Sequence, residues 1–377
     1  MRVMQAHWSV KKGWLKPVAE LDKGSAQLIL IFGGTDALER FPFQDLRTHY
    51  PEADIVGCST SGEIIGTEVF DDSVVVSAVT FEQTRLHVAS ETISGPEQSR
   101  SAGAALATKL AGDDLQHVFV LSDGLHVNGT ALIEGIQETL PESVVITGGM
   151  SGDGARFERT LVVGNSEPCE RQVVAVGFYG DHIRVGYGSL GGWEAFGPDR
   201  LITRSEGNVL YELDGEPALG LYKRYLGERA DGLPSSGLLF PLSLHNEKGV
   251  EGLVRTILAV DEEAGTMTFA GDMPEGGYAR LMKANFERLI DGACSAAESA
   301  KSTLVDSTAQ LAVLISCVGR KLVLKQRIEE EVEGVHDVLG AVPMTGFYSY
   351  GEFSPYKPTA QCKLHNQTMT ITIFAEK

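Results

Sequence analysis

Apolar and polar residues follow one another near the start of the chain in blocks that fit a strand, a helix and a second strand. Residues 28–32 form a continuous apolar run with the length of a buried strand. Residues 38–50 are amphipathic with helical spacing, and a second apolar strand then ends at Gly57. The pattern predicts a strand-helix-strand unit that leads directly into a glycine-bounded stretch at residues 57–63.

The same order of blocks occurs twice more along the chain. In the second copy, a strand at 117–121 precedes a helix at 130–140, for which Asn128 is the predicted N-cap, and a strand at 144–147. In the third copy, a strand at 311–316 precedes a helix with apolar residues spaced three and four apart, and the chain closes with a strand at 369–374. The helix positions are Leu324, Ile328, Val332, Val335 and Leu339. The sequence therefore predicts an internal repeat with three copies.

Pairs of β-rich stretches follow the glycine-bounded stretches of the first two copies. The first pair spans residues 73–81 and 85–90, and the second spans 173–179 and 183–187. Neighbouring strands with a short connection are typical of a β-hairpin. The predicted fold class is α/β in the broad sense, a mixed α+β fold. Its repeated strand-helix-strand-turn-hairpin units form mixed sheets with flanking helices.

A less symmetric region separates the second and third copies. It contains an extended run at 252–261 and a predicted long helix from Tyr278 to about Lys301. The loop at 188–199 is dense in glycine and proline and marks a domain border. We predict two docked domains, residues 1–198 with the first two copies and residues 199–377 with the third.

Charge and cysteine content narrow the classes of function. The chain has 51 acidic and 32 basic residues, a net charge of −19, which disfavours nucleic acid and anionic membrane surfaces as partners. Neither a secretory signal nor a transmembrane segment is readable in the sequence, so no membrane insertion is expected. Five widely spaced cysteines without a C-x-x-C motif indicate reduced thiols and a cytoplasmic location.

The glycine-bounded stretches carry the first candidate binding residues. They read GCSTSGE at 57–63, TGGMSGD at 147–153 and GFYSYGE at 346–352, and each combines hydroxyl groups with a closing acid. Glycine turns at strand ends let a ligand approach the backbone, but the acid repels phosphate and suits a ligand amine. The candidate ligand-binding residues here are Cys58, Ser59, Thr60, Ser61, Glu63, Ser151, Asp153, Tyr348 and Glu352.

Two cysteines raise the alternative of an enzyme with a thiol nucleophile. Cys58 follows a strand in a tight turn, and Cys317 lies close to Arg320, which lowers a thiol pKa if the geometry brings them together. For both cysteines, a small buried core residue is the favoured interpretation. We predict no catalytic residue, and keep the nucleophile as an alternative.

Histidines supply candidates for haem binding, although no spacing typical of a metal site occurs in the sequence, so no bound metal is predicted. His126, His245 and His365 lie beside predicted strands or in the loops that follow them. A non-covalent haem b needs one such histidine facing an apolar groove. The absence of C-x-x-C-H excludes covalent haem attachment.

Several motifs in the same order resemble the FIST family. They are GCSTSGEI at 57–64, SDGLHVNG at 122–129 with GGMSGDG at 148–154, SCVGR at 316–320 and GFYSYGEF with HNQT near the end of the chain. The resemblance covers most of the chain from about Gln27. It implies an N-terminal and a C-terminal FIST module in a sensory protein of signal transduction, usually bacterial. It adds the motif positions Asp123, Asn128, Cys317, Arg320, His365 and Asn366 to the candidate ligand-binding residues.

The resemblance leaves the ligand open. Small molecules such as amino acids are implied for the family, and a NosP-type subset binds haem to sense nitric oxide and acts on a histidine kinase. Our leading hypothesis is a cytoplasmic, non-catalytic sensor whose pocket is lined by the glycine turns. Glu63, Asp153, Arg320 and Glu352 would recognise the ligand, and a histidine kinase or a cyclic-di-GMP enzyme would receive the signal.

Overall fold

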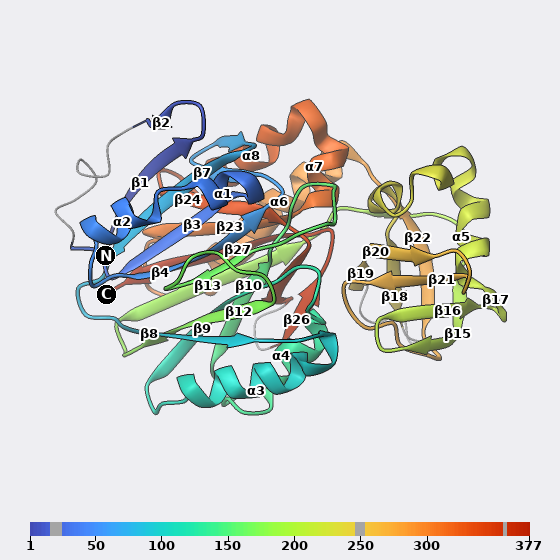
Figure 1. Cartoon of the computed structure of the whole chain (residues 1–377), viewed down its shortest axis with the longest axis horizontal. Coiled ribbons are helices and arrows are strands. Elements are labelled where there is room, and N and C mark those ends of the chain that lie inside the picture. Colours follow the sequence, from blue (N-terminus) through green and yellow to red (C-terminus); the bar gives the residue numbers. More distant parts are fainter. Residues whose placement is uncertain (16–24, 246–252, 357–359) are drawn as a thin grey trace.

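The protein consists of a body built from three similar sheets and a smaller lobe at one end of that body (Figure 1). The structure is a computed structural model, and it describes residues 1–15, 25–245, 253–356 and 360–377. The mixed α+β fold class predicted from the sequence is confirmed. No helix in the described residues is long and apolar enough to span a membrane.

Each sheet of the body has the same four-strand centre. Two parallel strands lie side by side, and two antiparallel strands extend the sheet beyond the first of them. The first sheet has β4 (Asp54–Thr60), β3 (Leu28–Gly34), β7 (Ser73–Thr80) and β1 (Arg2–Ser9). The second has β10 (Val145–Met150), β9 (Leu115–Ser122), β12 (Gln172–Tyr179) and β8 (Arg85–Thr92). The third has β24 (Met344–Ser349), β23 (Leu311–Cys317), β27 (Met369–Glu376) and β13 (Ile183–Leu190).

The predicted hairpins do not form, because the chain changes sheet between the two strands of each pair. Strand β7 pairs with β1 and β3, whereas β8 pairs with β12, and β12 and β13 also lie in different sheets. The connection at residues 81–84 is held by a carboxylate from the other end of the chain. Glu376 accepts N–H bonds of 2.7, 2.8 and 2.7 Å from Glu82, Gln83 and Thr84. These bonds turn the chain away from a hairpin and into the second sheet.

The strand after each glycine stretch also crosses to a neighbouring sheet. Strand β5 (Glu63–Ile65) pairs with β24, β25 (Gly351–Pro355) with β10, and β11 (Val162–Gly164) with β4. The remaining strands lie at sheet edges: β2 (Gly13–Trp14), β6 (Glu68–Phe70) and β26 (Cys362–His365). Because every repeat lends a strand to its neighbour, the three copies form a single body.

Apolar side chains from the three sheets meet along the middle of the body. Leu30, Phe119 and Val313, one from the central strand of each sheet, belong to the same buried cluster. The body helices are α1 (Thr35–Arg40), α2 (Phe43–His49), the 3-10 turn η2 (Pro96–Gln98), α3 (Ser99–Leu110), α4 (Gly129–Gln137), α6 (Phe286–Thr303), α7 (Val318–Leu324), η5 (Lys325–Arg327) and α8 (Ile328–Leu339). Several of them cover the outer faces of the sheets (Figure 1).

Three helix predictions need correction, because two of the helices are split and one begins later than predicted. The helix predicted at 38–50 is split into α1 and α2, because Pro42 has no N–H to donate and holds Phe41 in an extended conformation. Residues 278–283 are a strand, and α6 begins only after Asn285, whose side chain accepts the Arg288 N–H at 3.3 Å. The third-copy helix is split at Lys325, where φ is +52°.

The lobe is a nine-stranded sheet with its own apolar core. Its strands are β14 (Glu194–Ala195), β15 (Arg200–Glu206), β16 (Val209–Leu213), β17 (Glu216–Pro217), β18 (Leu242–His245), β19 (Leu253–Arg255), β20 (Ile257–Asp261), β21 (Thr266–Phe269) and β22 (Tyr278–Lys283). Its helical segments are α5 (Ala218–Leu226), η3 (Gly227–Gly232) and η4 (Ser235–Leu239). The border predicted between 198 and 199 lies just before β15 and stays a prediction.

Candidate functional site

The three glycine stretches meet at one end of the body in a closed ring of backbone hydrogen bonds. The bonds run from Ser61 N to Tyr348 O (2.8 Å), from Tyr350 N to Met150 O (3.3 Å) and from Gly152 N to Ser59 O (3.0 Å). The donors occupy equivalent positions in the three copies, and so do the acceptors. The sequence correctly placed these stretches at strand ends, and the repeated fold brings them together.

Only the tips of these stretches are turns, which corrects the prediction that the whole stretches are. Strands β4, β10 and β24 continue to Thr60, Met150 and Ser349. The first glycine of each stretch lies in a strand, where the neighbouring backbone leaves no room for a side chain. A Cβ at Gly57, Gly148 or Gly346 would lie 1.8 to 1.9 Å from the carbonyl oxygen of the adjacent strand.

Glu63 and Glu352 face inward and make matching sets of bonds. Glu63 accepts the Thr60 hydroxyl at 2.5 Å and, through its second oxygen, the backbone N–H (3.2 Å) and hydroxyl (2.8 Å) of Ser73. Glu352 likewise accepts bonds from Ser349 at 2.5 Å and from the N–H (3.2 Å) and hydroxyl (2.9 Å) of Thr368. Burial raises the pKa of Glu63 to about 7 and that of Glu352 to about 8. Both carboxyl groups are thus occupied in joining a turn to a strand.

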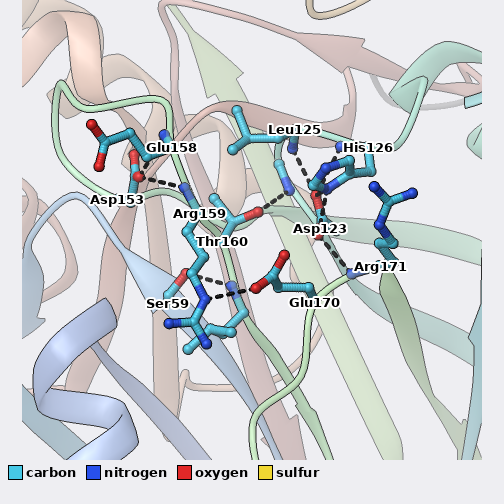
Figure 2. Close-up of polar contacts among 12 residues, drawn as sticks. Ser59, Asp123, Leu125, His126, Asp153, Glu158, Arg159, Thr160, Glu170 and Arg171 are labelled. Atoms are coloured by element: carbon cyan, nitrogen blue, oxygen red, sulfur yellow. Dashed lines mark hydrogen bonds and ion pairs between the residues drawn. The ribbon is translucent and has the colours of Figure 1, made fainter. Parts of the chain in front are cut away.

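Asp153 organises the loop that follows the second turn (Figure 2). Its two oxygens accept the backbone N–H groups of Phe157 (2.9 Å), Glu158 (2.9 Å) and Arg159 (2.8 Å). The Tyr350 hydroxyl from the third turn also donates to Asp153. This buried carboxylate therefore links the second and third copies. Ser151, in the same turn, is buried, and its hydroxyl has no partner among the described residues.

Asp123 plays the corresponding part at the end of β9 (Figure 2). It accepts N–H bonds of 2.8 Å from each of Leu125, His126 and Arg171. The Nδ1 atom of His126 lies 3.2 Å from the same carboxylate, and 26% of the His126 side chain is exposed. Asp123 is buried and fixes the loop that carries this histidine.

Arg320 is fully buried and pairs with a residue that sequence reasoning missed. Its Nε and Nη2 atoms lie 3.0 and 2.7 Å from one carboxylate oxygen of Glu331, on α8. The other oxygen of Glu331 accepts the hydroxyls of Tyr348 (2.7 Å) and Ser316 (3.1 Å). Glu331 lies three residues after Ile328 and four before Val335, on the apolar face of the predicted helix. A charged residue on that face was the available signal for this partner.

The candidate thiols are buried, and burial raises the pKa of Cys58 and of Cys317. Glu352 adds to the rise at Cys317, and the charge of Arg320 opposes it only as a smaller effect. Arg320 thus lowers this thiol pKa as expected, but the larger effect of burial leaves the pKa raised. The arginine is committed to Glu331, and desolvation is the larger effect.

The three candidate histidines belong to separate elements. His126 contacts Asp123, while His245 ends β18 in the lobe with its Nε2 3.3 Å from Asp199. His365 ends β26, and its Nε2 lies 2.9 Å from the Ser354 carbonyl oxygen, while burial lowers its pKa to about 4. Within the described part of the chain, no group of three or more potential metal ligands is found.

Asn128 and Asn366 lie where the lobe meets the body. Asn128 caps α4 as predicted, with its Oδ1 3.1 Å from the Ala131 N–H, and its Nδ2 donates to Asp272 of the lobe at 2.8 Å. Asn366 donates to the Tyr350 carbonyl oxygen at 3.0 Å and accepts the Thr256 N–H of the lobe at 3.4 Å. Two of the predicted site residues thus join the lobe to the body.

A cavity of about 190 Å³ lies close to these contacts and is lined from both sides. We call it the junction cavity. Its lining residues are Thr130, Ile133, Glu134 and Gln137 of α4, Leu253 and Arg255 of β19, and Gln361, Cys362, Lys363 and Leu364 at β26. A neighbouring groove of about 630 Å³ shares Gln137, Gln361 and Cys362 with it. The junction cavity is smaller than the roughly 300 Å³ at which drug-sized ligand sites begin, so its size suits only a small ligand.

Comparison with known families identifies the chain. A model of the FIST N domain matches residues 27–216, and a model of the FIST C domain matches residues 218–355. The chain belongs to the FIST family. FIST domains are sensory domains of signal-transduction proteins and bind small ligands such as amino acids. The border between the two FIST matches falls inside the lobe, between β17 and α5.

Relatives of this FIST protein are uncharacterized. One from Mycobacterium tuberculosis is 26% identical over 292 residues, which cover 74% of this chain and 73% of the relative. Another, from Methanocaldococcus jannaschii, is 24% identical over 340 residues, covering 82% of this chain and 63% of the relative. A solved structure of cyanuric acid hydrolase from A. caulinodans is similar with a TM-score of 0.39 and 8% identity, covering 100% of this chain and 99% of that one. That likeness is too weak to indicate a shared fold or activity.

Arg255 is the other functional candidate that sequence reasoning missed in this FIST protein. A weak signal existed, because Arg255 stands with Thr256 between the apolar residues Val254 and Ile257 of an extended run. Its neighbours could not be predicted from local patterns, because the cavity combines residues near 130, 255 and 362.

Proposed function

We propose that this chain is a sensory protein that binds an amino-acid-sized ligand in the junction cavity. The observation that carries the proposal is that one face of this cavity comes from the lobe and the other from the body. A ligand that contacts both faces stabilises one position of the lobe relative to the body. A sensor needs a ligand that binds one lobe position more tightly than the other, because only then does binding shift the balance between them.

The connections between lobe and body support this mechanism. Arg320 donates from Nη1 to the Gly191 carbonyl oxygen (2.5 Å), just before the lobe, and from Nη2 to the Leu289 carbonyl oxygen (2.6 Å), just after it. The same guanidinium is bonded to Glu331, which is bonded to Tyr348 of the third turn. A lobe displacement would therefore be felt at the ring of turns.

The glycine turns themselves have their polar groups largely occupied by the protein. Glu63, Asp153 and Glu352 each accept several bonds from neighbouring segments. We therefore place the ligand at the junction cavity and assign the turns to the route by which the signal reaches the body. Direct ligand contact by the turn residues stays a prediction.

A thermal-shift screen of the free amino acids tests the proposal. We expect at least one of them to raise the melting temperature of the wild type, because a ligand that binds the folded state stabilises it. Leu253→Trp should fill the junction cavity and abolish the shift. Val305→Trp is the control, since Val305 is 63% exposed outside the cavity and should leave the shift intact. A shift that survives Leu253→Trp, or a wild type that responds to no amino acid, would contradict the proposal.

The proposal keeps the protein non-catalytic. It is supported by the burial of Cys58 and Cys317, because burial raises the pKa of both thiols and so lowers their nucleophilicity. Haem b binding with nitric oxide sensing stays a prediction, tested by a Soret band that is lost on replacing His126, His245 or His365. The cytoplasmic location and the partner, a histidine kinase or a cyclic-di-GMP enzyme, also stay predictions.

A further inference from the structure

Arg255 places a buried positive charge at the wall of the junction cavity. The residue is only 3% exposed. Among the described residues, its guanidinium donates to backbone carbonyl oxygens alone. Nε lies 3.2 Å from the Asp272 oxygen, and Nη1 lies 3.0 Å from the Leu364 oxygen and 3.4 Å from the Val254 oxygen. No acceptor for Nη2 is found among the described residues. One edge of the guanidinium is therefore left to the cavity.

Arg255 forms no ion pair with a carboxylate of the described residues, although the nearby charge of Asp272 favours its protonated form. None of the ion pairs within the described ranges includes it, and the nearby Asp272 carboxylate accepts the Asn128 amide at 2.8 Å. Burial lowers the pKa of Arg255 to about 10, so the group is still protonated at neutral pH. A buried cation without a partner is costly, whereas a buried cation paired with an anion is a common binding arrangement.

Other groups at the cavity favour a single carboxylate over a more highly charged anion. Thr130 lines the same cavity, and its hydroxyl accepts the Asp272 N–H at 3.4 Å, which leaves the hydroxyl proton available to a ligand oxygen. Glu134 and Lys363, of opposite charge, also line the cavity, so with Arg255 the lining carries one net positive charge, which matches a single carboxylate better than a doubly charged phosphate. Arginine and carboxylate match in geometry, since two parallel N–H donors meet two oxygens.

We infer that the junction cavity binds the carboxylate group of a small ligand, with Nη2 of Arg255 as its anchor and the Thr130 hydroxyl as a second donor. This inference rests on the proposed function and names the chemistry of that same site. It makes Arg255 the residue that determines ligand class. The rest of the ligand would extend along α4 toward the neighbouring groove.

Titration calorimetry with matched pairs of probes tests the inference. Each pair consists of a free amino acid and its α-carboxamide, which has nearly the same shape but no negative charge. We expect the acids to bind the wild type at least about tenfold more tightly than the amides, as for loss of a charge-assisted hydrogen bond. Arg255→Gln should abolish this preference. Arg255→Lys keeps the positive charge but loses the two parallel N–H donors of the guanidinium, so it should retain part of the preference for acids.

Arg204→Gln is the matched control, because it removes one positive charge from the same lobe. Arg204 is 61% exposed on β15 and does not line the cavity, so its variant should bind as the wild type does. Circular dichroism of the Arg255 variants separates lost binding from lost folding. If Arg255→Gln does not fold, the Arg255→Lys comparison decides.

Three results would overturn the inference: equal binding of acids and amides, unchanged acid binding in a folded Arg255 variant, or no binding of any acid to the wild type. The first two leave the proposed function intact as long as Leu253→Trp still blocks binding. The proposed function fails separately, if Leu253→Trp has no effect on the binding of either probe.

Discussion

Arg320 and Glu331 form a fully buried ion pair in which the arginine also donates to Gly191, in the connection that enters the lobe, and to Leu289, in the first turn of α6 after the lobe. The two side chains are 0% exposed, and the shortest N–O distance between them is 2.7 Å. We predict that Glu331→Gln destabilises the folded state by about 3 to 5 kcal/mol, because it leaves a buried arginine without its counter-charge. Urea unfolding measures this free energy.

An exposed ion pair on the same helix gives the control for that experiment. Glu330 pairs with Arg327 at 2.6 Å, and both side chains are about 40% exposed. Glu330→Gln should cost no more than about 1 kcal/mol. Equal losses of unfolding free energy in Glu331→Gln and Glu330→Gln would show that the buried pair contributes no more to stability than the exposed pair.

The Glu352 carboxyl group predicts a pH-dependent stability. Its pKa is raised by burial to about 8 in the folded protein, against about 4.5 for a free carboxyl, so the folded state binds more protons than the unfolded state between these values. Stability relative to Glu352→Gln should therefore fall as the pH rises from about 5 to about 8, by up to roughly 1.4 kcal/mol per pH unit. Unfolding free energies of both proteins measured across this range check the slope. If the difference in unfolding free energy between the two proteins did not change with pH, Glu352 would be ionised over the whole range and its pKa would not be raised.

Close approach of the backbone at Gly57 predicts a severe effect of one methyl group. A Cβ there would lie 1.8 Å from the Ile31 carbonyl oxygen, so Gly57→Ala must push β3 and β4 apart. We expect a loss of several kcal/mol or failure to fold. Gly220→Ala is the matched control, because Gly220 lies within α5 with open space around it, and this change should stabilise the protein by about 0.5 to 1 kcal/mol. Similar melting temperatures for the two variants would refute the packing argument.

The cysteines are predicted to differ in reactivity according to burial. Cys169 and Cys294 are partly exposed, whereas Cys58, Cys317 and Cys362 are buried. Iodoacetamide at neutral pH should therefore label Cys169 and Cys294 first, as read by mass spectrometry of tryptic peptides. Fast labelling of Cys317 or Cys58 would instead favour the thiol-nucleophile alternative.

Much of the body follows from local patterns in the sequence. The three strand-helix-strand units were readable because buried strands and amphipathic helices have different periods. The glycine turns were expected to line one pocket, and the structure brings them together in a ring of backbone hydrogen bonds. The exchange of β8 and β13 between sheets was not readable, because a short connection between strands fits a hairpin equally well. The connection before β8 is held by Glu376, almost 300 positions away. The connection before β13 is held by the Lys377 N–H, which donates to the His182 carbonyl oxygen at 2.9 Å.

The candidate site was predicted only in part for the same reason. Asn128 and Asn366 stood in motifs and do lie at the lobe junction. Arg255 stood in no motif, and its importance depends on a cavity formed by three distant segments. Arg320 was singled out as a ligand contact, but the structure places it against Glu331, whose burial no local pattern fixes.

Hydrogen exchange with and without a bound amino acid tests the location of the ligand site most directly. The amino acid that gives the largest thermal shift is added at saturation, and exchange is followed by mass spectrometry. We predict slower exchange in β19 and β26, which line the junction cavity from opposite sides. Protection confined to the turns at 57–63, 148–154 and 346–352, with no change in β19 or β26, would contradict the account.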